Sequence, residues 1–410
     1  MELDRLERED GSPSHLRGQL VPADALVRGI RFASRLDEGS AQFLAGDRGT
    51  GKTTVLREVA EKLTDGGFCV IPVDAAARYP LTGELTPESV LVGLVAAVGV
   101  AAEREVGDPA RRALSRFGKR ISEALGSPID MSEPIDLRAL RFRLEEGAPL
   151  PERVRTNLRD PEGSLARGVQ EFFAGIAERL PSASTVLLID GLEKIQASTD
   201  QSASAYRLLS DVFVRFAHVI NPPALHVVYV VPPQTLVLAA SQLGTVYALP
   251  CVRLESRPPT RDRDDAGYAA LAALLGARID LDAIFGGRQS RATRALIHGS
   301  GGHLRTLLDL CREVVKEAVT LEPLPQLPLD AAFVQGVLAR GHMIRREQAR
   351  RLRPLLQRVA EGADAGMLSS EGLDQLVVAL DQELVGAYAN GDLWYDVHPL
   401  VRSVLDGPSG

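Results

Sequence analysis

The stretch Gly46-Asp47-Arg48-Gly49-Thr50-Gly51-Lys52-Thr53 decides the fold of this chain. Its glycines let the backbone curl until several N–H groups point at one centre, which is the arrangement that binds an anion. At this spacing Lys52 reaches the β- and γ-phosphates of a nucleotide, and the hydroxyl of Thr53 binds Mg²⁺. The stretch therefore predicts a phosphate-binding loop for ATP and Mg²⁺. Its candidate binding residues are Gly46, Asp47, Arg48, Gly49, Thr50, Gly51, Lys52, Thr53 and Thr54.

The residues on either side of the loop fit this interpretation. Residues 41–45 form a short apolar run that predicts a buried strand. Residues 53–63 place their apolar side chains on one helical face, and the N-terminus of such a helix attracts anions. Strand, glycine loop and helix is the order that a phosphate-binding loop requires. The alternative, a glycine-rich turn without a ligand, does not need this order.

A second motif lies at residues 185–194, Thr-Val-Leu-Leu-Ile-Asp-Gly-Leu-Glu-Lys. The apolar run predicts a buried strand, and Asp190 ends it. A carboxylate at that position can hold Mg²⁺, together with Thr53, in the manner of a Walker B acid. Glu193 follows three positions later and can orient or activate the attacking water. The alternative is a buried strand that ends in an ordinary turn aspartate.

Length and composition limit the class of protein. A chain of 410 residues predicts two or three domains, and 45% hydrophobic residues suffice for packed cores. A net charge of −7 argues against wholesale nucleic-acid binding, although a local basic patch remains compatible with it. The three cysteines are far apart in apolar settings, which suits free thiols. The charged N-terminus and the short apolar segments predict a cytoplasmic protein without a membrane span.

The rest of the first half predicts a mainly parallel sheet covered by helices on both faces. Its further strands are expected at 68–74, 225–231 and 251–254, with Pro72 favouring an edge position for the first of them. The charged helical stretches at about 103–180 predict an insertion between the second and third strands. The fold class is therefore α/β, a P-loop NTPase with a three-layer αβα core. A cluster of Arg and Lys at 111–120 is interpreted as a solvated helix face.

The C-terminal part predicts two further modules. Residues 268–321 have a helical pattern and contain Ser-Gly-Gly-His-Leu-Arg at 300–305, which places Arg305 in the first turn of a helix. A proline-rich linker follows at 322–328, and the last segment has helices closed by a hairpin signal at 389–392. The predicted domains are an N-terminal segment (1–30), the ATPase core (31–256), a helical lid (257–322) and a winged-helix-like domain (330–410).

With these motifs placed, the chain resembles the AAA+/STAND group of P-loop ATPases, bacterial regulatory ATPases with a helical lid and a C-terminal winged helix. The resemblance covers about residues 40–330 and, more weakly, the C-terminus. It implies ATP-dependent switching or assembly as a homo-oligomer or with a protein partner. Lys52 and Thr53 match Walker A, and Asp190 with Glu193 match Walker B. Arg305 matches the sensor 2 arginine, which would reach the phosphates from the lid and act with Asp190 and Glu193 in catalysis.

The sequence departs from this family in two places. Where many members carry a polar sensor 1, this chain has Val-Pro-Pro at 231–233, with Gln234 and Thr235 as the nearest substitutes. No arginine lies between Thr235 and Cys251, where an arginine finger is often found. These departures favour a slow switch, or hydrolysis completed by a residue of a partner, over rapid hydrolysis in a ring.

Three functions follow as hypotheses. The first is a regulatory ATPase of bacterial signalling or defence, whose nucleotide state controls assembly or partner engagement. The second is an initiator-type ATPase that loads onto nucleic acid through the winged helix and the arginines of Arg340–Arg358. Those arginines are also compatible with a solvated or intersubunit helix, and the acidic chain favours that interpretation. The third is a kinase-like enzyme for a small substrate, for which no separate substrate site stands out in the sequence.

Overall fold

The computed structural model describes residues 23–36, 38–75, 86–125, 156, 160, 163–177, 184–192, 202–222, 225–341, 343–390 and 392–405. They form two compact units. The first, called here the core unit, comprises the described residues of 22–45 and 52–248. The second, called here the C-terminal unit, comprises 249–405 together with the loop Gly46–Gly51.

The sheet of the core unit has five strands in the order β2-β3-β4-β1-β5. Three of its pairings are parallel, with Ala45 opposite Val231, Ile189 opposite Tyr229, and Asp74 opposite Asp190. This parallel sheet with helices on both faces confirms the predicted α/β fold and is consistent with the core of a P-loop NTPase. The strands are β1 (Ser40–Gly46), β2 (Cys69–Asp74), β3 (Thr185–Asp190), β4 (His226–Val231) and β5 (Thr245–Leu249).

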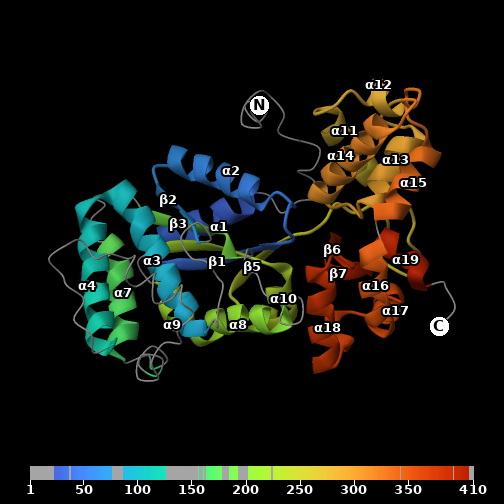
Figure 1. Ribbon diagram of the computed structural model, residues 1–410. Helices are drawn as coiled ribbons and strands as arrows, with labels where there is room; N and C mark the ends of the chain where they lie inside the picture. Colours follow the sequence, from blue (N-terminus) through green and yellow to red (C-terminus); the bar gives the residue numbers. More distant parts are fainter. Residues whose placement is uncertain are drawn as a thin grey trace. The chain divides into compact units, whose positions relative to one another are not determined.

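Two helix layers enclose this sheet, which Figure 1 shows between them. Alternate side chains of β1 point to opposite faces. Phe43 packs edge-on against Phe213 of α8, with ring centroids 5.1 Å apart. On the other face, α1 and α2 bury Ile30, Val59 and Leu63 completely. The helices of the unit are α1 (Ala23–Arg35), α2 (Lys52–Asp65), α3 (Pro87–Val106), α4 (Asp108–Leu125), α7 (Ser164–Ala177), α8 (Ser202–Arg215), α9 (Ala217–Ile220), α10 (Pro233–Ala239) and η3 (Ala240–Gln242).

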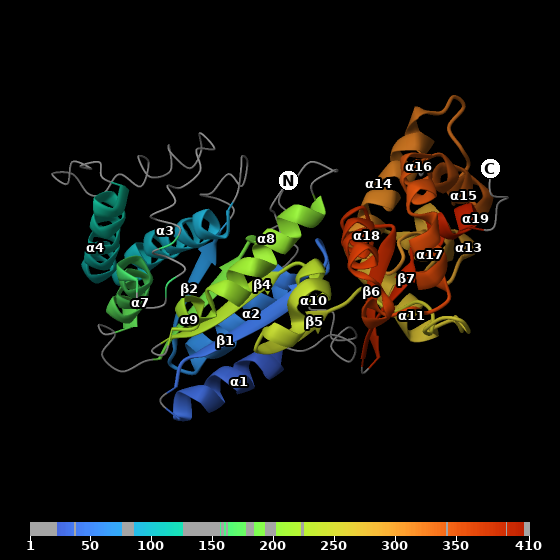
Figure 2. The ribbon, with the colours of Figure 1, turned by 90° about the horizontal axis from the view of Figure 1, so that it is seen from below.

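Most described residues of the predicted insertion lie in helices. Helices α4 and α7 pack side by side, as Figure 2 shows, and bury Phe117 and Phe172. The basic residues of α4 are exposed or half-buried. Arg111 bonds Glu103 and Asp108, and Arg120 bonds Glu171. This is the solvated helix face that the sequence predicts, and the structure adds its ion pairs.

The prediction of the fifth strand was wrong. The strand β5 lies at Thr245–Leu249, and residues 251–254 are not part of the sheet. Pro250 has no backbone N–H to continue the ladder, so the strand ends before it. The backbone N–H groups of Cys251 and Val252 instead donate to Ala387 and Gly302. Residues 251–255, called here the connector, thus belong to the C-terminal unit.

The C-terminal unit is helical and is closed by an antiparallel hairpin, in which Val385 pairs with Val397 and Asn390 with Asp392. Its first helices share one apolar core around Leu271, Leu296, Leu307 and Val334. The elements are α11 (Asp265–Gly276), α12 (Leu281–Phe285), α13 (Arg291–Gly299), α14 (Leu304–Thr320), α15 (Ala331–Gly341), α16 (Met343–Arg351), α17 (Arg353–Ala360), η4 (Ala365–Met367), α18 (Ser370–Asp381), β6 (Val385–Asn390), β7 (Asp392–Val397) and α19 (Pro399–Leu405).

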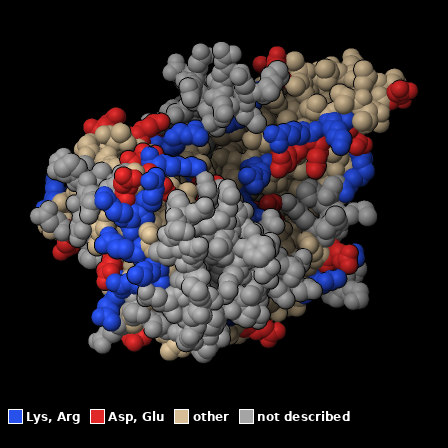
Figure 3. All heavy atoms as spheres, turned by 60° about the vertical axis from the view of Figure 1, so that its left-hand side comes forward, with Lys and Arg blue, Asp and Glu red and all other residues tan. Residues whose placement is uncertain are grey.

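Charges are mixed on the face that Figure 3 draws, where acidic side chains interrupt the groups of Lys and Arg. Among the described helices, none combines the length and the apolar character needed to cross a membrane.

Candidate functional site

The predicted phosphate-binding loop has the backbone that its glycines allow. Gly49 and Gly51 have φ values of 84° and 96°, a left-handed conformation that favours glycine. Thr50 holds the turn, because both its backbone N–H and its hydroxyl donate to the carbonyl oxygen of Asp47, at 3.3 and 2.9 Å. The loop thus ends in a tight turn immediately before a helix. This is the local geometry in which backbone N–H groups can surround a phosphate.

The helix α2 begins at Lys52, the residue that directly follows the loop. Lys52 is 4% exposed, whereas Thr53 and Thr54 are exposed. A helix N-terminus attracts negative charge through its free N–H groups and its dipole. The first turn of α2 therefore combines the lysine, the hydroxyl and the helix end that a bound triphosphate requires. Arg48 in the loop is also exposed.

Thr53 and Asp190 meet at the end of the sheet. The hydroxyl of Thr53 donates to Asp190 Oδ2 at 2.8 Å, and the backbone N–H of Gly191 donates to Asp190 Oδ1 at 2.8 Å. Asp190 is the last residue of β3, so its carboxylate lies at the carboxyl edge of the parallel sheet, where ligands of α/β proteins bind. The structure thus brings together the two residues that the sequence assigns to Mg²⁺.

These two groups have the chemistry of a magnesium site. Mg²⁺ prefers oxygen ligands and is usually held by one or two protein oxygens, water and the phosphates of its substrate. A hydroxyl and a carboxylate oxygen side by side fit this requirement. The described residues contain no group of three or more His, Cys, Asp and Glu that would form an all-protein metal cage.

Strand β4 separates β1, which leads into the loop, from β3, which ends in Asp190. The residues that follow β4 are therefore at the same edge, between the two motifs. Gln234 is 3% exposed and Thr235 is fully buried. Gln234 Oε1 and Thr235 Oγ1 have no hydrogen-bond partner in the described part of the chain. A buried polar atom without a partner is costly, so these two atoms are candidates for contact with a ligand or a water.

A further acid, to which the sequence motifs assign no role, lies at this edge. Asp74 ends β2 and stands opposite Asp190 in the parallel register. Neighbouring strands are about 4.8 Å apart, and residues in register point to the same face. The signal was available, because both predicted strands end in an aspartate. Glu193, the predicted water-activating residue, lies outside the described residues.

Arg305 lies directly against the phosphate-binding loop. It is an exposed residue in the first turn of α14, as predicted. A methyl group placed on Gly49 would lie 2.4 Å from Arg305 Cβ and 3.3 Å from its Nε. The arginine stem therefore occupies the space beside Gly49, and only a residue without a side chain fits at that point.

A second contact of the loop involves the connector. The thiol of Cys251 donates to Asp47 Oδ2 at 3.7 Å. Burial and the nearby Asp47 carboxylate raise the pKa of Cys251 well above the ordinary value of a thiol. Cys251 therefore stays protonated and serves as a hydrogen-bond donor to the loop rather than as a nucleophile.

Residues 30–214, which contain the loop and Asp190, match the AAA ATPase domain family. No curated protein matches the sequence.

Among solved structures, the chain is similar to an Aeropyrum pernix ORC2 protein solved as ADPNP–ADP complexes, with a TM-score of 0.41 and 14% identity over 98% of this chain and 96% of that chain. It is also similar to the ADP form of that protein, with a TM-score of 0.37 and 13% identity over 94% and 91% of the two chains. A third similar structure is Drosophila ORC bound to DNA, with a TM-score of 0.36 and 14% identity over 94% and 86%.

Proposed function

We propose that this AAA ATPase domain protein is a regulatory ATPase of the STAND type, which binds ATP and Mg²⁺ and hydrolyses ATP slowly. Its nucleotide state would control assembly or the engagement of a protein partner. In this proposal residues 257–322 are the lid and residues 330–410 are a winged-helix-like domain. Glu193 would orient the attacking water, and Arg305 would contact the phosphates from the lid.

The observation that carries the proposal is the hydrogen bond between Thr53 and Asp190. It places the oxygens of the two motifs where one Mg²⁺ could be held by both. Bound Mg²⁺ would neutralise phosphate charge, which is the main chemical requirement of phosphoryl transfer. Lys52 would bind the same phosphates, and the N-terminus of α2 would add its dipole.

Two features of the sequence around the site support slow hydrolysis. The residue expected to position the water or the γ-phosphate from β4 is Gln234, which is a neutral amide. The sequence between Thr235 and Cys251 supplies no arginine to stabilise the transition state. An arginine finger typically accelerates such reactions by about 10³- to 10⁵-fold. Without an arginine from this stretch, the chain would switch slowly until a partner completed the site.

Gel filtration with ATP and Mg²⁺, with ADP, and without nucleotide tests this function. We expect ATP and Mg²⁺ to change the elution volume, and Lys52→Ala to abolish the change. ATP turnover measured on the same fractions reports hydrolysis. A protein that binds no nucleotide by fluorescence titration would contradict the proposal.

Loading onto nucleic acid is the second candidate function. The charges of helix α18 disfavour it. Affinity for nucleic acid depends on Lys and Arg that neutralise phosphates. Helix α18, which precedes the hairpin, carries Glu371, Asp374 and Asp381 and no Lys or Arg. In the basic stretch, Arg353 and Arg358 donate to the backbone oxygens of Leu405 and Met367.

The two candidates are separated by a titration with duplex DNA at several salt concentrations. A nucleic-acid-loading protein should show an affinity that falls steeply with salt. We expect no such binding. A steep salt dependence that is lost when the exposed Arg350 and Arg351 are replaced by Gln would favour the second candidate.

A further inference from the structure

We propose that residues 249–405 move as one arm, so that the β6–β7 hairpin moves whenever nucleotide repositions Arg305. The lid and the C-terminal hairpin would then move together in response to nucleotide and would not be two independently hinged domains. This proposal depends on the proposed function only for its trigger, because the contacts that build the arm are properties of the fold.

The first set of contacts converges on the turn Gly301-Gly302, which directly precedes His303 and α14. The hydroxyl of Tyr388, in β6, donates to the carbonyl oxygen of Gly301 at 2.7 Å. The backbone N–H of Val252, in the connector, donates to the carbonyl oxygen of Gly302 at 3.0 Å. Hairpin and connector therefore hold the same turn, and Arg305 follows this turn by three residues.

The approach of the connector to this turn is very close. A methyl group on Gly302 would lie 1.8 Å from the carbonyl oxygen of Val252, and Gly302 has a φ of 82°. On the other side of the connector, Cys251 N–H donates to Ala387 of the hairpin at 2.9 Å. The connector is thus fixed between the lid and the hairpin by backbone hydrogen bonds on both sides.

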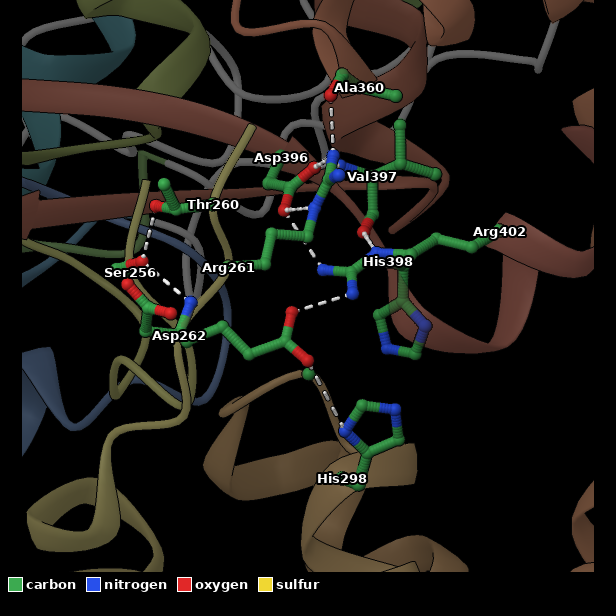
Figure 4. Close-up of polar contacts among 12 residues, drawn as sticks. Ser256, Thr260, Arg261, Asp262, His298, Ala360, Asp396, Val397, His398 and Arg402 are labelled. Carbon is green, nitrogen blue, oxygen red and sulfur yellow. Dashed lines mark hydrogen bonds and ion pairs between the residues drawn. The ribbon is translucent and has the colours of Figure 1, made fainter. Parts of the chain in front are cut away.

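The second set of contacts, called here the Asp396 clamp, consists of Asp396, Arg261, Arg402 and Glu255. Asp396 accepts hydrogen bonds at 2.9 Å from Arg261 Nε and Nη2 and from Arg402 Nη2. Arg402 Nη1 donates to Glu255 Oε2 at 2.6 Å. Figure 4 shows Arg261 and Arg402 converging on the Asp396 carboxylate. The clamp joins the segment around the connector to β7 and α19.

Burial of Asp396 makes separation of the clamp residues unfavourable. Asp396 is only 2% exposed, so separation of the hairpin from Arg261 would leave a buried carboxylate without one of its partners. Removing one partner of a buried ion pair is strongly unfavourable, whereas an exposed pair separates at little cost. Motion between lid and hairpin is therefore opposed by the chemistry of a single carboxylate.

Two strained residues support the same conclusion. In the described part of the chain, the non-glycine residues with positive φ are Arg261, at 49°, and Glu383, at 53°. Arg261 reaches from the segment after the connector to the hairpin. Glu383, just before β6, accepts a hydrogen bond from Thr306 of α14 at 3.2 Å. Strained backbone persists only where surrounding contacts determine it, and both instances occur where lid and hairpin meet.

Native-state hydrogen exchange on the full chain without nucleotide tests the arm independently of ATP. If residues 249–405 form one body, the slowest amides of α13–α14 and of the hairpin should open together, with equal dependence on denaturant. In Asp396→Asn the hairpin should exchange faster than the lid. Asp392→Asn, the same substitution at an exposed position of the same hairpin, is the matched control and should behave as wild type.

A second experiment measures exchange with ATP analogue and with ADP. In wild type we expect both segments to change together, by about ten- to a hundredfold, as a charge-assisted contact of Arg305 would provide. Asp396→Asn should keep the change in α13–α14 and lose it in the hairpin. Tyr388→Phe removes only the hydroxyl that donates to the carbonyl oxygen of Gly301, and it should also reduce the hairpin response. This variant replaces Asp396→Asn in the test if Asp396→Asn does not fold.

The outcomes separate the two proposals. Independent opening of lid and hairpin in nucleotide-free wild type would overturn the arm, as would a lid response without a hairpin response. Unaltered hairpin coupling in both folded variants would also overturn it. Cooperative opening without any effect of nucleotide would leave the arm intact and contradict the proposed function instead.

Discussion

The hydroxyl of Thr53 lies 2.8 Å from a carboxylate oxygen of Asp190, although 137 positions separate the two residues in the sequence. Thr53 is at the start of α2 and Asp190 at the end of β3, and another strand lies between β1 and β3. The contact therefore depends on the strand order of the whole sheet. It gives the candidate site two adjacent oxygen atoms that could bind Mg²⁺.

Lys52→Ala should sharply weaken nucleotide binding, because it removes a buried cation from the loop. A hundredfold excess of ATP over its dissociation constant should stabilise the wild-type protein by about 2.7 kcal/mol. Thermal unfolding with and without ATP and Mg²⁺ measures this difference. Equal shifts for wild type and Lys52→Ala would show that the nucleotide binds elsewhere or not at all.

Asp190→Asn should impair Mg²⁺-dependent ATP hydrolysis, since an amide is a poorer ligand for the ion than a carboxylate. Glu193→Gln should leave nucleotide binding intact and slow turnover, because it removes the proposed general base. Phosphate release and nucleotide titration distinguish the two effects. Wild-type turnover in Glu193→Gln would assign the positioning of water to another group, with Asp74 and Gln234 the next to be replaced.

Arg305→Ala should bind ADP nearly as wild type and lose the difference between ATP and ADP in the exchange of α13 and α14. The guanidinium is worth about 1.5–3 kcal/mol if it contacts the γ-phosphate. Arg312→Ala is the matched control, because Arg312 is an exposed arginine of the same helix that pairs with Asp309. A retained nucleotide response in Arg305→Ala would exclude Arg305 as the coupling residue.

Gly302→Ala should destabilise the C-terminal unit by about 2–5 kcal/mol. The added methyl group would clash with the carbonyl oxygen of Val252, and alanine is strained at the positive φ of this position. Gly366→Ala is the control, since no atom lies within 4 Å of the added carbon and its φ is not positive. Urea unfolding followed by circular dichroism gives both values. Similar midpoints for the two variants would mean that the turn moves away freely.

The free energy of unfolding should decrease as the pH falls below about 6.5, the ordinary pKa of histidine. Burial lowers the pKa of His226, whose Nδ1 lies 2.9 Å from the hydroxyl of Ser40. Between the lowered pKa of His226 in the folded protein and its ordinary pKa in the unfolded chain, the unfolded chain binds more protons than the folded protein. The free energy of unfolding therefore rises with pH in this range. His218 and His298 shift in the same direction. Urea unfolding across this range should show a weaker pH dependence in His226→Gln, and an unchanged slope would contradict the role of His226.

Much of the core could be predicted from sequence because its signals are local. The loop at 46–53 and the strands ending in Asp74 and Asp190 are each visible within about ten residues. The predicted position of the fifth strand was wrong because residues 251–254 are as apolar as a strand. Their backbone partners, Gly302 and Ala387, are far away in the sequence.

The contacts among modules lay beyond sequence reasoning for a related reason. Arg261 and Asp396 are ordinary charged residues in any local window, and 135 positions separate them. Only the fold shows that Asp396 is buried and shared by two arginines. The proposed contact of Arg305 with a nucleotide stays a prediction, although its place beside Gly49 is now defined.

The chain contains one tryptophan, and it lies in the hairpin of the proposed arm. Trp394 is buried and stacks on Tyr388, with ring centroids 4.8 Å apart and planes inclined by 27°, and it shares a small apolar cluster with Cys251. The intrinsic indole fluorescence of the protein therefore comes from this single position. Stopped-flow fluorescence after mixing with nucleotide can therefore measure the rate at which the proposed arm moves, in the protein without any added label.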